Sequence, residues 1–145
     1  MDNRVKIKIL EIEKFYKIQI IFIKKPDWLG LENHWDNIIY INNNLKYNYT
    51  RLMSTVIHDV GHIYCYRNGL FKNFHTKKLF IEDLNPQEKK AYCLIALKAE
   101  RYIDRWAMKE LKKWDINLTY FANYYESNYC IESLRKRLNN IMNKI

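Results

Sequence analysis

Hydrophobic and polar residues follow a strand-like pattern in part of the first third of the chain. Residues 17–25, KIQIIFIKK, are rich in β-branched and aromatic side chains and stop at Pro26, which predicts a strand. Residues 38–42, IIYIN, predict a second short strand, because a turn-prone run of asparagines follows them. The segment between them, PDWLGLENHWDN, predicts a loop or a hairpin connection.

The first sixteen residues fit two periods at once. Val5, Ile7 and Ile9 alternate with polar residues as in a strand. Ile9, Ile12 and Tyr16 instead follow the three- and four-residue spacing of a helix. The pattern alone leaves both a strand and a helix open for this segment.

From residue 47 onward the spacing of apolar residues is helical. Residues 47–68 carry apolar side chains three and four positions apart, and Gly69 is a typical residue just past the end of a helix. Asn85 as N-cap and Pro86 in the first turn predict the start of a second, long helix that ends near residue 114.

The remaining residues complete the predicted architecture. Residues 118–145 predict two shorter helices with a break near residues 127–128. A helix or strand, two strands and then helices predict a small α+β domain, with a short β-sheet near the N-terminus packed on a helical core. Glycine and proline are too few for long irregular linkers, so we expect a single domain over residues 1–145.

Composition indicates a soluble globular chain that folds without disulfide bonds. Its 145 residues suffice for a hydrophobic core, and the hydrophobic share of 48% with a charged share of 28% excludes a disordered chain. The three cysteines, Cys65, Cys93 and Cys130, have no regular spacing, and no signal-peptide pattern precedes them. We therefore expect a cytoplasmic protein whose cysteines are small core residues. The longest apolar run, IQIIFI, is too short to span a bilayer, so we expect no membrane segment.

The formal charge of +9 is dispersed along the sequence. Lysine and arginine occur in short clusters that form no single basic arm, which is typical of a solvated surface. An acidic partner and nucleic acid remain alternatives. Nucleic acid is the weaker of the two, because the aromatic residues do not group with the basic ones in a recognisable binding module.

Candidate chemistry lies in STVIHDVGHIYCY, residues 54–66. His58 and His62 are four residues apart, so a helix places both imidazoles on one face. Two imidazoles and a carboxylate suit zinc and leave its fourth position open for water. Asp59 directly follows the first histidine, where a carboxylate can accept a proton from that water. The alternative is that both histidines are ordinary polar residues of a partly buried helix.

The best third ligand is Glu100, in KAERYIDRWAMKEL on the second long helix. If this helix packs on the first, Glu100 completes a set of two histidines and one glutamate. Asp104, one turn further, can accept a hydrogen bond from a ligand imidazole and fix its tautomer. The alternative is a solvated acid pair that faces neighbouring basic residues.

The remaining histidines and the tyrosines give weaker signals. His34 and His75 lie in loop-like surroundings and are predicted to be surface or hydrogen-bonded structural residues, with His75 as a reserve ligand. A tyrosine or histidine near such a zinc ion commonly stabilises an oxyanion. The twelve tyrosines offer many candidates for this role, and their spacing does not choose among them.

VIHDVGH followed by ERYIDRWAMKEL resembles the ImmA/IrrE-type metallopeptidases and, more broadly, the zincins. In that family a histidine pair on one helix precedes a motif Glu-x-x-Ala-(Asn/Asp)-x-Phe-Ala on the next long helix. Here isoleucine and tryptophan replace the alanine and phenylalanine of that motif. The preceding strand, glycine-containing loop and strand ending in asparagine are also similar to the family, so the resemblance covers most of the chain.

The resemblance implies a zinc-dependent endopeptidase with His58, His62 and Glu100 as ligands and Asp59 in the position of the general base. It also implies a phage or mobile-element setting and a specific protein substrate, such as a helix-turn-helix repressor or another regulator. The family has glutamate where this chain has Asp59, and the shorter side chain withdraws the carboxylate by roughly 1.5 Å. A zincin-like protein that holds zinc and binds or inhibits a partner without cleaving it is therefore the alternative.

Overall fold

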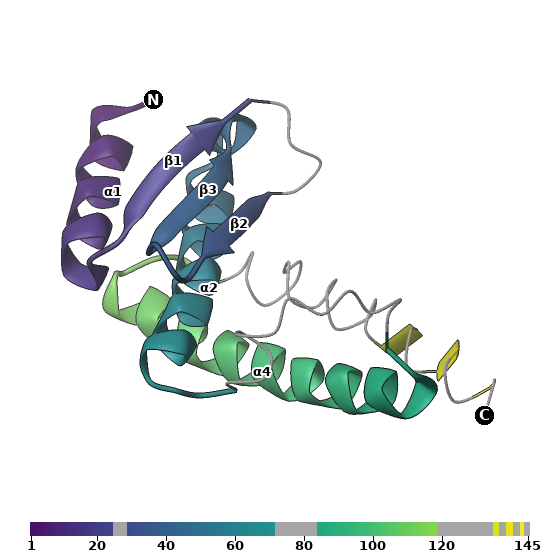
Figure 1. Ribbon diagram of the computed structural model, residues 1–145. Helices are drawn as coiled ribbons and strands as arrows, with labels where there is room; N and C mark the ends of the chain where they lie inside the picture. Colours follow the sequence, from purple (N-terminus) through teal and green to yellow (C-terminus); the bar gives the residue numbers. More distant parts are fainter. Residues whose placement is uncertain (25–28, 72–83, 119–134, 137–138, 141–142, 144–145) are drawn as a thin grey trace.

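A mixed β-sheet near the N-terminus packs on two helices from the first half of the chain, and a long helix from the second half packs on one of these (Figure 1). The structure is a computed structural model that describes residues 1–24, 29–71, 84–118, 135–136, 139–140 and 143. The predicted α+β class is confirmed. The elements with assigned bounds are α1 (Asn3–Tyr16), β1 (Gln19–Ile23), β2 (Gly30–Asn33), β3 (Ile38–Asn42), the 3-10 helix η1 (Asn43–Tyr47), α2 (Tyr49–Arg67) and α4 (Pro86–Lys113).

The ambiguous first segment forms a helix, α1. The Asp2 side chain caps it by accepting a hydrogen bond of 2.7 Å from the backbone N–H of Arg4. A strand would have placed Ile7 on the same face as its neighbours Val5 and Ile9, whereas in the helix Ile7 is 57% exposed. The buried face follows the helical spacing Val5, Ile9, Ile12 and Tyr16.

The sheet has the strand order β1-β3-β2, with β1 parallel and β2 antiparallel to β3. Both predicted strands are confirmed. Because these two strands are parallel, no hairpin joins them, and the described part of the segment between them contains an additional strand, β2, which forms a hairpin with β3. Its residues, GLEN, have low intrinsic preference for strands, so only pairing with β3, from Gly30 opposite Ile41 to Asn33 opposite Ile38, makes the segment extended.

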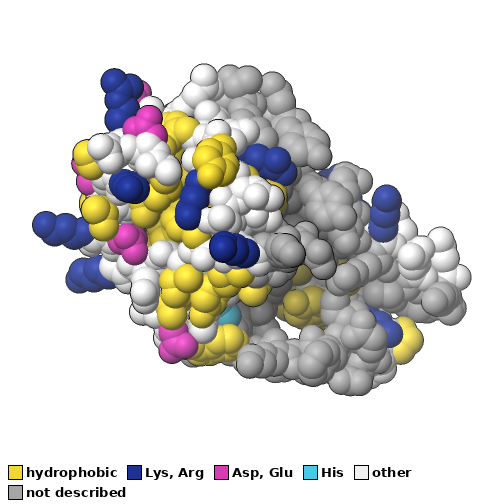
Figure 2. All heavy atoms as spheres, turned by 90° about the horizontal axis from the view of Figure 1, so that it is seen from above, with side chains coloured by type: hydrophobic (Ala, Val, Ile, Leu, Met, Phe, Trp, Pro, Cys, Tyr) yellow, Lys and Arg dark blue, Asp and Glu magenta, His cyan; other side chains and the backbone are white. Residues whose placement is uncertain are grey.

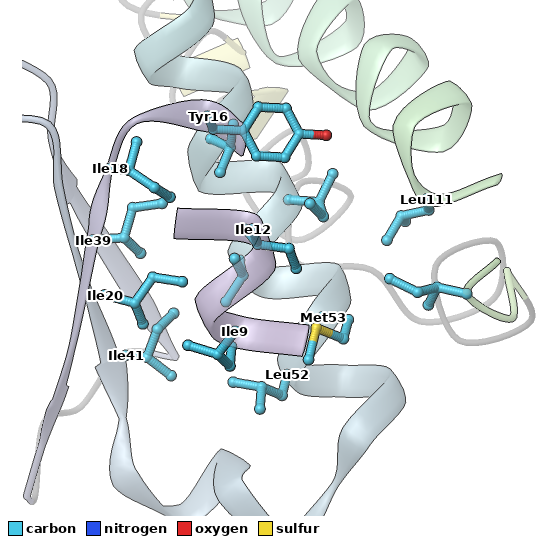
Figure 3. Packing of buried hydrophobic residues seen from close by; sticks show 14 of the residues in the cluster. Ile9, Ile12, Tyr16, Ile18, Ile20, Ile39, Ile41, Leu52, Met53 and Leu111 are labelled. Atoms are coloured by element: carbon cyan, nitrogen blue, oxygen red, sulfur yellow. The ribbon is translucent and has the colours of Figure 1, made fainter. Parts of the chain in front are cut away.

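The hydrophobic core lies between one face of the sheet and the helices (Figure 3). Isoleucines 20, 39 and 41 point from the strands toward α1 and α2, and Leu111 contributes from α4. Cys65 and Cys93 are buried and not in disulfides, as expected, while Cys130 lies outside the described residues.

Both long helices begin and end close to their predicted limits. The side chain of Asn48 caps α2, and Gly69, just beyond its end, has a φ of +67° that suits glycine. At the start of α4, Asn85 and Glu88 form a capping box around Pro86. The predicted break near residues 127–128 lies outside the described residues.

Charged side chains are scattered on the visible face of the molecule. Figure 2 shows lysine and arginine side chains spread over this face, with hydrophobic side chains between them. Across the described residues, no helix combines the length and the apolar character that crossing a bilayer requires.

A buried polar network joins α1 to α4. The Tyr16 hydroxyl donates a hydrogen bond of 3.1 Å to Glu110 Oε1 and accepts one of 2.7 Å from Trp114 Nε1. Lys113 Nζ lies 2.9 Å from Glu110 Oε2. The network ties the N-terminal helix to the C-terminal end of the helix that carries Glu100.

This network gives a stability prediction at alkaline pH. Burial raises the pKa of Tyr16 above its ordinary value. The hydrogen bond from Trp114 opposes this shift, and the negative charge of Glu110 adds to it. The neutral phenol therefore stabilises the fold below the unfolded pKa of about 10, and this contribution is lost as the pH rises above it. We expect Tyr16→Phe to lower the free energy of unfolding at pH 8 by about 1–3 kcal/mol and to reduce its further decrease toward pH 11.

Urea unfolding at both pH values measures these effects. Tyr47→Phe is the matched control, because Tyr47 is 85% exposed. An equal alkaline loss of stability in wild type and Tyr16→Phe would contradict the expectation.

Candidate metal centre

The two long helices approach each other closely at Gly61 of α2. A Cβ atom at this position would lie 2.7 Å from Ile103 Cγ2 and 3.2 Å from Trp106 Cε3, both on α4. Glycine in a helix interior costs about 1 kcal/mol relative to alanine, so its presence here reflects this close packing. The approach brings α4 within reach of the histidines that flank Gly61 in sequence.

His58, His62 and Glu100 form a buried group that can hold a metal ion. The two Nε2 atoms are 3.3 Å apart. Glu100 places Oε2 3.4 Å from His58 Nε2 and Oε1 3.2 Å from His62 Nε2. Each of the three residues is at most 8% exposed. Two helices distant in sequence therefore direct three potential ligands at one point, which we call the triad.

Asp104 lies on the other side of the His58 ring. Its Oδ1 is 3.7 Å from His58 Nδ1, while Nε2 of the same ring faces Glu100. A carboxylate at this position favours the tautomer with the proton on Nδ1 and leaves Nε2 as an acceptor or ligand. The separation of 3.7 Å is longer than a hydrogen bond, so the orienting role of Asp104 stays a prediction.

Asp104→Asn tests this role. An amide in place of the carboxylate no longer favours the Nδ1 proton, so we expect metal affinity to fall by about ten- to a hundredfold while the fold is retained. Competition with a chromogenic chelator measures the affinity. Asp115→Asn is the control, because Asp115 is exposed and lies beyond the end of α4. Equal affinity of wild type and Asp104→Asn would leave the orienting role without support.

Asp59, the predicted general base, faces β2. The residue is 4% exposed. A Cβ atom at Gly30 of β2 would overlap with Asp59 Oδ2, which places the carboxylate directly against the strand backbone. Asp59 is not one of the three metal-ligand candidates. The carboxylate therefore lies between α2 and the edge strand, and Asp59 is next in sequence to His58, one of the three potential ligands.

His34 is a buried, hydrogen-bonded residue. Its Nδ1 lies 2.9 Å from Glu32 Oε2, and its ring is 4.6 Å from that of Tyr66 and 3.9 Å from that of Trp35. The hydrogen-bonded alternative predicted for His34 is therefore confirmed, and a surface position is not. His75, the reserve ligand, lies outside the described residues.

The side chains that follow His62 on α2 have other packing roles. The Tyr64 ring stacks on that of Trp106 with centroids 4.9 Å apart. Burial raises the pKa of the Cys65 thiol to about 12, with the charge of Glu100 adding to the effect. Cys65 is thus a neutral core residue at physiological pH. Among the tyrosines that the structure describes, these contacts distinguish none as an oxyanion donor.

Sequence reasoning overlooked two glycines that shape the site, Gly30 and Gly61. A glycine inside a helix or a strand often marks a close backbone approach, and this signal was available at both positions. The sequence alone does not predict which atoms lie close to each glycine. In the structure, side chains of α4 lie close to Gly61, and the Asp59 carboxylate lies close to Gly30.

None of the protein families, characterised proteins and solved structures compared with the chain matches it.

Proposed function

We propose that the protein is a zinc-dependent endopeptidase that acts on a specific protein substrate. The observation that carries the proposal is the buried triad, in which two imidazole nitrogens and a carboxylate converge within 3.2–3.4 Å of one another. The resemblance of VIHDVGH and ERYIDRWAMKEL to the ImmA/IrrE-type metallopeptidases supports the reaction class.

The donor set fits zinc. Bonds of about 2.0–2.1 Å in a tetrahedron separate neighbouring ligand atoms by about 3.3–3.4 Å, and the two imidazole Nε2 atoms are 3.3 Å apart. Each of these nitrogens lies 3.4 or 3.2 Å from a different oxygen of Glu100, and one ligand atom from each residue can be chosen so that all three lie within 4.8 Å of one another. Two histidines and one glutamate are a donor set of catalytic zinc sites, where three protein ligands leave one position open. Calcium and magnesium prefer all-oxygen surroundings, so the imidazoles disfavour them.

In this proposal each polar residue of the site has one task. Zinc, when bound, would supply a Lewis acid that polarises a carbonyl group and lowers the pKa of water. His58, His62 and Glu100 would hold the ion, and Asp104 would keep the proton of His58 on Nδ1. Asp59 would accept the proton of the attacking water and pass it to the leaving amine.

The proposed substrate is a regulatory protein such as a helix-turn-helix repressor, in a phage or mobile-element setting. This part rests on the family resemblance. The net charge of +9 supports a partner with an acidic surface. The cysteine pattern supports action in the cytoplasm.

A second candidate function is binding of the same kind of partner without cleavage. The position of Asp59 favours it, because aspartate is one methylene shorter than the family's glutamate and lies against Gly30. A catalytic group misplaced by about 1 Å can cost on the order of a hundredfold in rate. In that case the triad would stabilise a binding surface, and the protein would inhibit its partner.

Capture of the partner from the native host separates the two functions. Wild type, Asp59→Ala and Asp59→Glu are each used as bait, and the captured protein is inspected for cleavage. A peptidase should lose cleavage in Asp59→Ala and keep or increase it in Asp59→Glu. An intact partner captured equally by all three variants, with the same inhibition of that partner, would contradict cleavage and favour the binding function.

A further inference from the structure

Residue 30 of β2 has no room for a side chain. Its strand partner is Ile41, whose side chain is fully buried, so this position lies on the sheet face that covers α2. A Cβ atom here would overlap with Asp59 Oδ2 and would lie only 2.7 Å from Thr55 Cγ2. Of the described glycines, Gly69 alone has a positive φ, so glycine at position 30 is required by space and not by backbone conformation.

The neighbours of Asp59 on α2 restrict where its carboxylate can move. Thr55, one turn earlier, is held in place because its hydroxyl donates a hydrogen bond of 2.9 Å to Arg51 O. Ile63, one turn later, is fully buried in the hydrophobic core. A carboxylate displaced from Gly30 along the helix axis would therefore meet the methyl group of Thr55 on one side and the apolar side chain of Ile63 on the other.

We propose that Gly30 is a positioning residue for Asp59, so that the backbone of the edge strand sets the place of the carboxylate beside the triad. This inference rests on the proposed function. A general base must lie within about 3 Å of the proton that it accepts, or one water molecule away. The short side chain of aspartate can bring its carboxylate to that proton only from a narrow range of positions. The backbone at Gly30, which the carboxylate contacts, limits this range.

The contact itself is tested in metal-free protein by a double-mutant cycle. All variants carry Thr55→Ser, which removes the methyl group near Gly30 and keeps the hydroxyl bonded to Arg51. Gly30→Ala should lower the melting temperature by about 2–4 °C, the shift typical of a modest steric conflict in a chain of this size. In the Asp59→Ala background this decrease should be largely absent. An equal decrease in both backgrounds would overturn the inference.

The positioning role is tested in zinc-loaded protein with acetohydroxamate as the probe, because its polar hydrogens can bond to a nearby carboxylate. Gly30→Ala should weaken acetohydroxamate binding at least about tenfold, equivalent to losing one hydrogen bond to a charged group. Zinc affinity should stay within about twofold of that of Thr55→Ser alone. In the Asp59→Ala background Gly30→Ala should not alter acetohydroxamate affinity.

The controls separate failure of this inference from failure of the proposed function. Gly69→Ala is the matched glycine variant, because its Cβ would have no heavy atom within 4 Å, and it should leave acetohydroxamate affinity unchanged. Absence of zinc binding in the wild-type protein would contradict the proposed function. The double-mutant cycle in metal-free protein would still show whether Gly30 and Asp59 are in contact. Normal zinc binding with unchanged acetohydroxamate affinity in Gly30→Ala would reject the positioning role alone.

Discussion

Glu100→Ala is expected to abolish tight zinc binding. Glu100 is the only member of the triad on α4, and its two oxygens lie 3.2 and 3.4 Å from the histidine nitrogens. Loss of a residue that merely orients a ligand costs up to about a hundredfold in metal affinity, so removal of the ligand itself should cost more. Competition with a chromogenic chelator and metal analysis of the purified protein measure the loss.

Thermal unfolding gives a second measure of the same change. Zinc at a thousandfold excess over its dissociation constant stabilises the folded state by about 4 kcal/mol, which corresponds to roughly 10 °C in a domain of this size. A chelator should lower the melting temperature of wild type by this amount and leave that of Glu100→Ala nearly unchanged. Arg101→Ala is the control, because this neighbour on α4 is exposed. Zinc binding of wild-type strength in Glu100→Ala would exclude the proposed centre.

Gly61→Ala is expected to weaken zinc binding by about ten- to a hundredfold, although the glycine is not a ligand. The added methyl group would lie 2.7 Å from Ile103 Cγ2, so α4 must move or Ile103 must repack. Overpacking of this kind costs about 1–3 kcal/mol, and the higher helix propensity of alanine returns about 1 kcal/mol. The larger consequence is a shift of Glu100 relative to the histidine pair, since Glu100 is on the same helix as Ile103.

A compensating variant tests this explanation. Ile103→Ala removes the methyl group that Gly61→Ala would meet, so the double variant should regain a large part of the zinc affinity lost by Gly61→Ala. Zinc titration of the two single variants and the double variant measures the coupling. Additive losses in the double variant would show that helix spacing at Gly61 does not control the triad.

Local patterns were sufficient for the parts of the fold that depend on neighbours in sequence. Helical periodicity places His58 and His62 on one face without knowledge of any other element. Asn85 and Pro86 mark the start of α4 because capping is also a local interaction. The proposed ligand Glu100 came from the sequence as a conditional prediction, because it required α4 to pack on α2, and the structure places the two helices together.

Contacts between distant segments account for what the sequence left undecided or missed. β2 is a strand because it pairs with β3, although its own residues favour a turn. The first segment is helical because Ile12 and Tyr16 are buried together with Ile9, which a strand would not allow. The sequence predicts Asp59 as a general base with a short side chain, but its contact with Gly30 depends on the packing of the sheet on α2.

The hairpin register of β2 and β3 couples the turn at residues 34–37 to the proposed chemical centre. Gly30 pairs with Ile41 and faces Asp59, while the next residue, Leu31, pairs with Tyr40 and is half exposed. A slip of one residue exchanges the two faces of a strand. Inserting or deleting one residue in this turn would therefore bring a leucine against Asp59 in place of glycine. Changes in the length of a surface hairpin could thus close the site without altering any of its polar residues.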